Sequence, residues 1–214
     1  VEKYVKKNIV YRIISMKKMK EEMEKLNKDV YIFCKHFNFQ LFTELEVCEK
    51  QWYAGMEQHC LNDSLFSNQS LSLQAQLEII ITISYELENH KDDHDPWSLE
   101  QMQTLKLNIV RQLGTNMRYT PDWFIPSERV NDNKEVFANG SLGMLYKCSW
   151  NNGKVYIVKC FHLNENLVGI ALYDQIALEM DRWFGLNHPH IHKMYGGSHI
   201  SDPGFIVCEY GSNG

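Results

Sequence analysis

The spacing of apolar residues changes near residue 120, and this change constrains the fold more than any other feature. Before it, apolar side chains recur mostly every three or four residues, as on one face of a helix. They are Tyr4, Val5, Ile9, Ile13, Met16, Met23, Leu26, Val30, Phe33, Phe37, Phe42, Leu45, Cys48, Trp52, Met56, Leu73, Leu77, Ile80, Ile81, Leu87, Met102, Leu105, Ile109 and Leu113. Pro121 and Pro126 then stop any helix and favour extended chain.

Beyond these prolines the chain predicts strands and turns. Asn152 and Gly153 are typical of a two-residue hairpin turn that needs positive φ, and Asp202-Pro203-Gly204 predicts a second turn. The segment 172–186 between them has helical spacing. The predicted strands include 145–150, 155–161, 194–195 and 205–208. The order is strand, strand, strand, helix, strand, strand.

These patterns predict an α+β protein. We expect an antiparallel helical bundle over residues 1–118, a linker at 119–126, and a five-stranded antiparallel sheet with one helix over residues 127–214. Ser98 followed by Gln101, just after Pro96, has the spacing of a capping box and predicts the start of the last bundle helix.

Composition and charge exclude several function classes. The net charge of −5 argues against a nucleic-acid binder, although residues 1–28 carry +5. A solvated face of the bundle explains this basic segment better than contact with an acidic membrane, so we expect no membrane contact. Six cysteines without a Cys-x-x-Cys pair indicate reduced thiols in a cytoplasmic, intracellular protein. No apolar run reaches the length of a membrane span.

Two features in the second half suggest phosphate chemistry. Gly140 and Gly143 lack a Cβ, so a hairpin that carries them can bring backbone N–H groups against phosphate oxygens. Lys159 ends the apolar run 155–158, and a lysine on a buried strand needs an anionic partner. Glu179, twenty residues further along the predicted helix, is the candidate carboxylate.

With these motifs, residues 123–214 resemble the N-terminal lobe of the tyrosine-kinase-like group of Ser/Thr protein kinases. The family pattern Gly-x-Gly-x-x-Gly-x-Val appears here with Ala138 at the first glycine and Leu145 at the valine. The resemblance implies that Lys159 holds the α- and β-phosphates and pairs with Glu179, and that these two are the catalytic residues.

The resemblance also implies an ATP site. Its residues would be Ala138, Asn139, Gly140, Ser141, Gly143, Leu145, Ile157, Lys159, Cys208, Glu209 and Gly211. Ile157 takes the usual alanine's place above adenine, Cys208 is the gatekeeper, and the Glu209 carbonyl and Gly211 amide would face the adenine edge. The histidines at 188, 190, 192 and 199 have no ligand spacing, so we expect no metal site.

Two functions remain open from the sequence. The chain reaches Gly214 without the His-Arg-Asp and Asp-Phe-Gly motifs of the C-terminal lobe, so Mg²⁺ is expected only with that lobe. In the first interpretation, the chain is the ATP-binding portion of a signalling kinase that phosphorylates protein hydroxyls, and it is inactive alone. Its partners would be ATP and the parent kinase's protein substrate. In the second, it is a non-catalytic, pseudokinase-like module that acts through protein contacts, including self-association of the bundle. Ala138 and Ile157 favour the second interpretation, whereas Lys159 and Glu179 favour the first.

Overall fold

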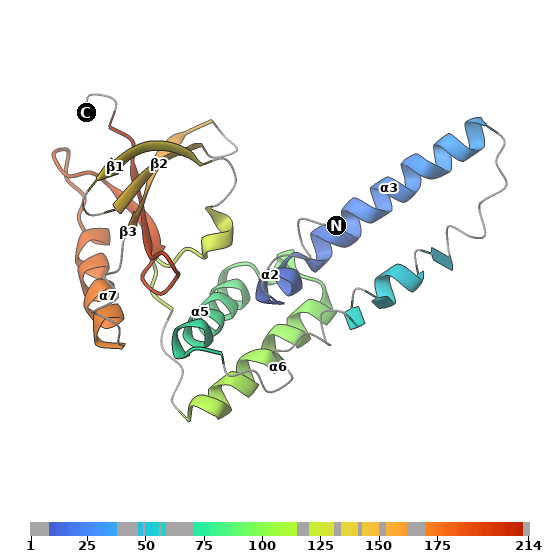
Figure 1. Ribbon diagram of the computed structural model, residues 1–214, viewed down its shortest axis with the longest axis horizontal. Helices are drawn as coiled ribbons and strands as arrows, with labels where there is room; N and C mark the ends of the chain where they lie inside the picture. Colours follow the sequence, from blue (N-terminus) through green and yellow to red (C-terminus); the bar gives the residue numbers. More distant parts are fainter. Residues whose placement is uncertain are drawn as a thin grey trace. The chain divides into compact units, whose positions relative to one another are not determined.

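Helices precede a five-stranded antiparallel sheet in the computed structural model, which confirms the predicted α+β class (Figure 1). The helices of the first half are α2 (Ile9–Ile14), α3 (Met16–His36), α5 (Leu73–Asn89) and α6 (Pro96–Leu113). The structure describes residues 9–37, 47–48, 50–55, 57–58, 71–114, 120–130, 134–140, 143–149, 153–161 and 170–211.

The chain forms two compact units. The helical unit comprises residues 1–72 and 86–116, and the sheet unit comprises residues 73–85 and 117–214. Most of α5 therefore belongs with the sheet, although the sequence pattern grouped it with the bundle. The division of the chain into a bundle over residues 1–118, a linker at 119–126 and a sheet domain over residues 127–214 stays a prediction.

The helical unit has a small methionine core. Met16 and Met19, in the first turn of α3, are buried, and the partly buried rings of Tyr11 and Trp97 pack against them. A polar contact lies close to this core. The Lys20 ammonium is 3.1 Å from the carboxylate of Glu57 and 5.8 Å from the ring centroid of Trp97. These contacts join α2, α3 and α6, and they agree with the helical periodicity of this half.

Helix α6 begins one turn earlier than the capping-box pattern predicts. Asp95 is the N-cap and Pro96 is the first helical residue. The Ser98 amide donates to Asp95 Oδ1 at 3.2 Å, and the Ser98 hydroxyl donates to Asp95 Oδ2 at 2.8 Å. The prediction with Ser98 as the cap is wrong because proline fits the first helical position, where no N–H is needed, and an aspartate directly before it can cap.

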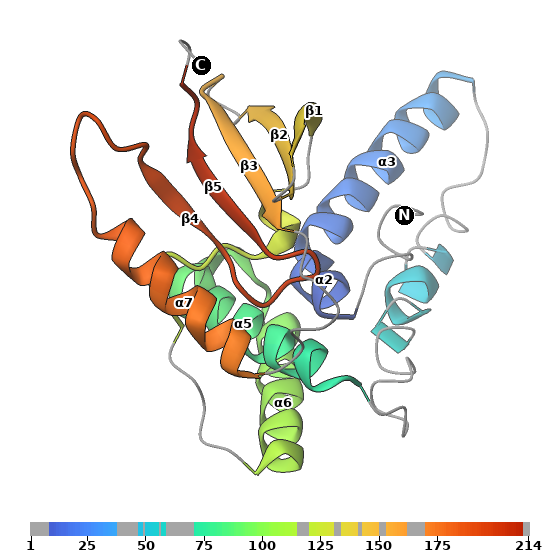
Figure 2. The same cartoon turned by 60° about the vertical axis from the view of Figure 1, so that its left-hand side comes forward.

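The sheet has the order β1-β2-β3-β5-β4, and every neighbouring pair is antiparallel (Figure 2). Its strands are β1 (Glu135–Gly140), β2 (Gly143–Ser149), β3 (Val155–Phe161), β4 (Met194–Ser198) and β5 (Phe205–Glu209), and α7 (Ile170–Phe184) packs against β4. Among the described residues, the β2–β3 pairing runs from Gly143 and Phe161 to Ser149 and Val155, and Asn152 of the predicted turn lies outside the described residues. Gly153 does have the predicted positive φ, +79°.

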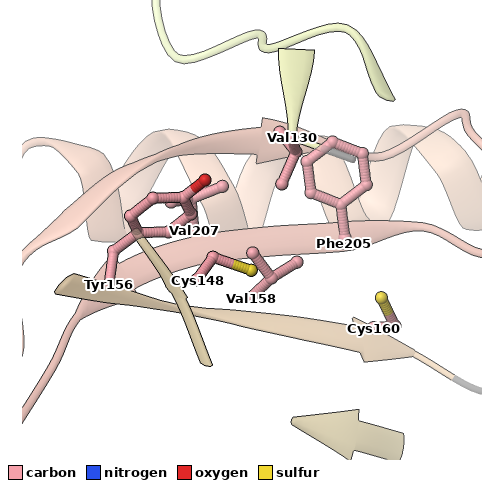
Figure 3. Packing of buried hydrophobic residues seen from close by; sticks show 7 residues of the cluster. All are labelled: Val130, Cys148, Tyr156, Val158, Cys160, Phe205 and Val207. Carbon is pink, nitrogen blue, oxygen red and sulfur yellow. The ribbon is translucent and has the colours of Figure 1, made fainter. Parts of the chain in front are cut away.

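One face of the sheet forms the core of its unit (Figure 3). The buried side chains are Cys148, Tyr156, Val158, Cys160, Phe205 and Val207, and Val130 meets them from the segment before β1. Phe124 of that segment forms an isolated parallel bridge with Gly197 of β4, whereas Ser127–Arg129 form a short 3₁₀ helix, so the prediction of extended chain after Pro126 is wrong there. The Ile125 amide donates to the Gly197 carbonyl, and the Gly197 amide donates to the Trp123 carbonyl, both at 2.9 Å. The opposite face is buried at Ile206 and Cys208 and partly exposed at Leu145, Ile157 and Lys159.

Within the sheet unit, α5 is attached to the turn between β4 and β5 by polar contacts. The Gln74 side-chain amide donates to the Ile200 carbonyl at 3.0 Å. The Ser201 hydroxyl donates to Glu78 Oε1 at 2.7 Å, and the Ser198 hydroxyl lies 2.7 Å from that of Ser201. Burial raises the pKa of Glu78, and the nearby carboxylates of Glu128 and Asp202 raise it further, against the Ser201 hydrogen bond. The charged form of Glu78 is therefore disfavoured in the folded protein.

Replacing Glu78 by glutamine is expected to stabilise the protein at neutral pH. The folded-state pKa is raised, so this residue's contribution is greatest below the ordinary glutamate pKa and is lost as pH rises through the folded value. Glutamine stays neutral and still accepts from Ser201. Thermal unfolding from pH 4 to pH 8 should give Glu78→Gln a higher Tm than wild type at pH 7, with a gap that narrows on acidification. The exposed control Glu100→Gln should give no such trend, and a lower Tm for Glu78→Gln at pH 7 would contradict this account.

Candidate functional site

The register of the sheet brings four predicted site residues to the face opposite the core. Leu145 of β2 pairs with Lys159 of β3, and Ile157 of β3 pairs with Cys208 of β5. Because side chains alternate along each strand, all four side chains lie on one face. The side chains of Leu145, Ile157 and Lys159 are partly exposed there. We call this surface the platform face.

The glycine-rich segment forms the predicted hairpin at one end of the platform face. Gly140 at the end of β1 pairs with Gly143 at the start of β2, and Ala138 pairs with Leu145. Asn139 pairs with Met144, and Ser141 lies outside the described residues. Gly143 has φ +141°, and a Cβ built there would overlap the carbonyl oxygen of Cys160. Only glycine therefore allows β2 to approach β3 this closely.

Lys159 carries a positive charge on the platform face. Its ammonium lies 5.9 Å from the ring centroid of Phe161, towards the hairpin end of β3. Cys208, across Ile157, is buried, and burial raises the pKa of its thiol to about 11 although the nearby Lys159 charge lowers it. The thiol is therefore protonated at neutral pH, and it acts as an apolar neighbour of the lysine and not as a nucleophile.

Glu179 lies on α7, and its side chain is exposed. Lys159 and Glu179 both belong to the described residues, and no ion pair joins them there. The side of α7 that meets the sheet carries Met180, whose Cε would be 2.7 Å from a Cβ built on Gly197. Asp181, on the next position, accepts a hydrogen bond from the indole N–H of Trp123. These two contacts set the rotation of α7, and the catalytic role of Glu179 stays a prediction.

The residues predicted to face the adenine edge lie at the end of β5. The Glu209 amide donates to the Lys193 carbonyl at 2.9 Å, and its side chain is exposed. A Cβ at Gly211 would lie 2.8 Å from Cε1 of His192. This close approach explains a glycine at position 211, since a side chain there would displace the imidazole ring.

The sequence prediction missed a lysine and two aromatic rings beside this edge. The Lys147 ammonium lies 4.9 Å from the ring centroid of Tyr210, and Phe137 meets the same ring edge-on at 6.1 Å. Lys147 follows Leu145 by two residues, so the period of a strand could have placed it on the platform face. The contact with Tyr210 depends on β5 and had no local signal.

The platform face combines the apolar side chains of Leu145 and Ile157 with the ammonium groups of Lys159 and Lys147. Leu145 and Ile157 can pack against a planar ring, and Lys159 with the hairpin amides can bind an anionic group. In the part of the chain that the structure describes, no group of three His, Cys, Asp or Glu side chains has the geometry of a metal site. Leu145, Ile157 and Lys159 together suit a planar ring that carries an anionic group.

No protein-family model matches the sequence, and a search of curated proteins found none similar to it. The kinase resemblance therefore rests on the motifs and on the register described above. Among the helices that the structure describes, none is both long and apolar enough to cross a lipid bilayer.

Proposed function

We propose that the sheet unit binds ATP on the platform face, as the N-terminal lobe of a Ser/Thr protein kinase. The observation that supports this most is the pairing of Leu145 with Lys159, next to the hairpin closed by Gly140 and Gly143. This pairing puts an apolar contact for a base and an ammonium for a phosphate on the same face, directly opposite each other on neighbouring strands.

Each part of the nucleotide has a candidate partner. Lys159 and the backbone N–H groups near Gly143 would bind phosphate oxygens, because an ammonium and glycine amides both suit a polyanion. Leu145 and Ile157 would cover the adenine ring, with Cys208 beside it. Ile157 is bulkier than the alanine of the family pattern, so it would reduce the space for the ring and lower the affinity.

Phosphoryl transfer needs residues beyond those that bind the nucleotide. Catalysis of this reaction depends on placing Mg²⁺, the γ-phosphate and the accepting hydroxyl together. The His-Arg-Asp and Asp-Phe-Gly motifs that do so in kinases are not among these 214 residues. We therefore propose that the chain supplies the ATP-binding half of a kinase that acts on protein hydroxyls, and that it does not phosphorylate protein by itself.

Replacing Lys159 by glutamine is expected to weaken ATP binding about tenfold, since an ammonium–phosphate contact is a charged hydrogen bond. Titration calorimetry of the full chain with ATP in EDTA would measure the dissociation constant. Lys193→Gln removes an exposed lysine next to β4 and serves as the matched control. Equal affinity of wild type and Lys159→Gln for ATP, with both proteins folded, would contradict the proposal.

A second candidate function is a non-catalytic signalling module that acts through protein contacts. Among the described residues no ion pair joins Glu179 to Lys159, and this favours the module, since a working kinase needs the lysine–glutamate pair. Helix α3 also favours it, because Leu26, Phe33 and Phe37 on and after this helix are each more than half exposed. Analytical ultracentrifugation, together with the ATP titration, distinguishes the two functions. Self-association of a chain that binds no ATP supports the module, and a monomer that binds ATP supports the kinase lobe.

A further inference from the structure

A hollow of about 400 Å³ lies at the end of the sheet remote from the glycine hairpin. Its lining consists of Lys134, Glu135, Lys147, Cys148, Ser149 and Val155. None of these is among the nucleotide-binding residues predicted above. The volume is in the range of small-molecule sites, and the lining is rich in charged and polar side chains.

The hollow lies at the end of the strands where the platform face meets the core face, because Lys147, Ser149 and Val155 belong to the former and Cys148 to the latter. Lys147 follows Leu145 by two residues on β2 and pairs with Ile157, and Ser149 pairs with Val155 at the next position on the same face. Along β2, Lys147 lies about 13 Å from Gly143, at ~3.3 Å a residue. A single extended ligand can therefore contact the hairpin, the apolar centre and the hollow.

The hollow carries an excess of positive charge. The Lys134 ammonium lies 5.5 Å from the ring centroid of Tyr146, and Lys147 contacts the ring of Tyr210. Within the described residues neither ammonium forms an ion pair, even though the carboxylate of Glu135 also lines the hollow. Two lysines and the Ser149 hydroxyl against one carboxylate favour an anionic group.

The ammonium groups of the two lysines on the platform face lie towards opposite ends of the strands. Lys159 contacts Phe161, towards the hairpin, whereas Lys147 contacts Tyr210, at the opposite end of the strands. Phe137 packs edge-on against Tyr210 and so helps to fix the ring that Lys147 contacts. The two ammonium groups thus flank Leu145 and Ile157 from opposite ends.

We propose that the hollow is a phosphate subsite and that the preferred ligand is a nucleotide with a second phosphate remote from its polyphosphate. This proposal rests on the proposed nucleotide site for the remainder of the ligand. Lys147 is its main specificity determinant, and Lys134 and Ser149 complete the polar lining.

The test compares ADP with its 3′-phosphorylated form on the full chain, in EDTA, by titration calorimetry. The 3′-phosphate should tighten binding about tenfold in wild type, and Lys147→Gln should remove this preference. The preference should survive in Lys193→Gln and should weaken as salt increases, because exposed charges are screened. A thermal melt of each variant establishes that it is folded. Equal binding of the two nucleotides to wild type overturns the subsite and leaves the ATP proposal standing.

Titration with pyrophosphate, an anion without a base, tests the phosphate subsite independently of the ATP site. If ADP does not bind at all, the proposed function fails, and pyrophosphate then tests the hollow as a site for a free anion. Pyrophosphate binding that falls about tenfold in Lys134→Gln/Lys147→Gln supports the phosphate subsite. Absence of pyrophosphate binding, or binding that ignores both substitutions, overturns it.

Discussion

Replacing Gly143 by alanine is expected to destabilise the sheet unit by roughly 3–5 kcal/mol and to abolish ATP binding. The new methyl group would overlap the backbone carbonyl oxygen of Cys160, and a backbone atom in a paired strand cannot move aside. The φ of +141° adds strain for any residue with a Cβ. Denaturant unfolding followed by tryptophan fluorescence would measure the change in free energy.

Gly153 offers a matched control for this substitution. It also has a positive φ, +79°, but a Cβ built there meets no atom within 4 Å. Gly153→Ala should therefore lose only the backbone term of about 1–2 kcal/mol and should retain ATP binding. Equal stability losses for the two alanine variants would show that the approach of β2 to β3 at Gly143 does not hold the hairpin together.

Replacing Phe124 by alanine is expected to cost about 3–5 kcal/mol, the usual range for a fully buried phenylalanine. Phe124 is 1% exposed, bridges to Gly197 of β4, and packs edge-on against Tyr85 at 5.8 Å between ring centroids. The substitution would leave a cavity and remove the ring contact between Tyr85 of α5 and the segment before β1. The fluorescence of Trp123, the preceding residue, would report on the unfolding of this region.

Phe137 is the control for the loss of a phenyl ring. Its side chain is 53% exposed and has one aromatic neighbour, Tyr210. Phe137→Ala should cost no more than about 1.5 kcal/mol, the upper value for an aromatic pair. A loss of less than 1.5 kcal/mol for Phe124→Ala would mean that the segment before β1 is only loosely attached to the sheet.

The sequence predicts the parts of the fold that local patterns control. The turn signal at Asn152 and Gly153 and the apolar run 155–158 predicted two strands, and the register of the sheet then places Leu145, Ile157 and Lys159 on one face. Gly140 and Gly143 gave the hairpin, because few residues tolerate the backbone approach they permit. Spacing of three and four gave α7 to within two residues at each end.

Features that depend on tertiary packing could not be predicted in this way. Whether Glu179 meets Lys159 depends on the rotation of α7, which Met180 and the Trp123–Asp181 hydrogen bond control. The attachment of α5 to the sheet unit depends on Glu78 and Ser201, which are 123 residues apart in the sequence. No periodicity signals such a polar contact.

The rotation of α7 bears on both proposed functions. Glu179 is exposed, Asp181 is bonded to Trp123, and among the described residues no carboxylate forms an ion pair with Lys159. Such an arrangement is compatible with nucleotide binding and lacks a requirement of catalysis. ATP binding is therefore the property on which the account rests.

The central claim is that the face carrying Leu145, Ile157 and Lys159 binds ATP. Amide hydrogen exchange of the full chain, measured with and without saturating ATP in EDTA, tests it most directly. The account predicts slower exchange in peptides from residues 138–149, 155–161 and 205–211, with little change in α3 and α6. Unchanged exchange throughout the sheet unit at saturating ATP, or slowing confined to the helical unit, would contradict it.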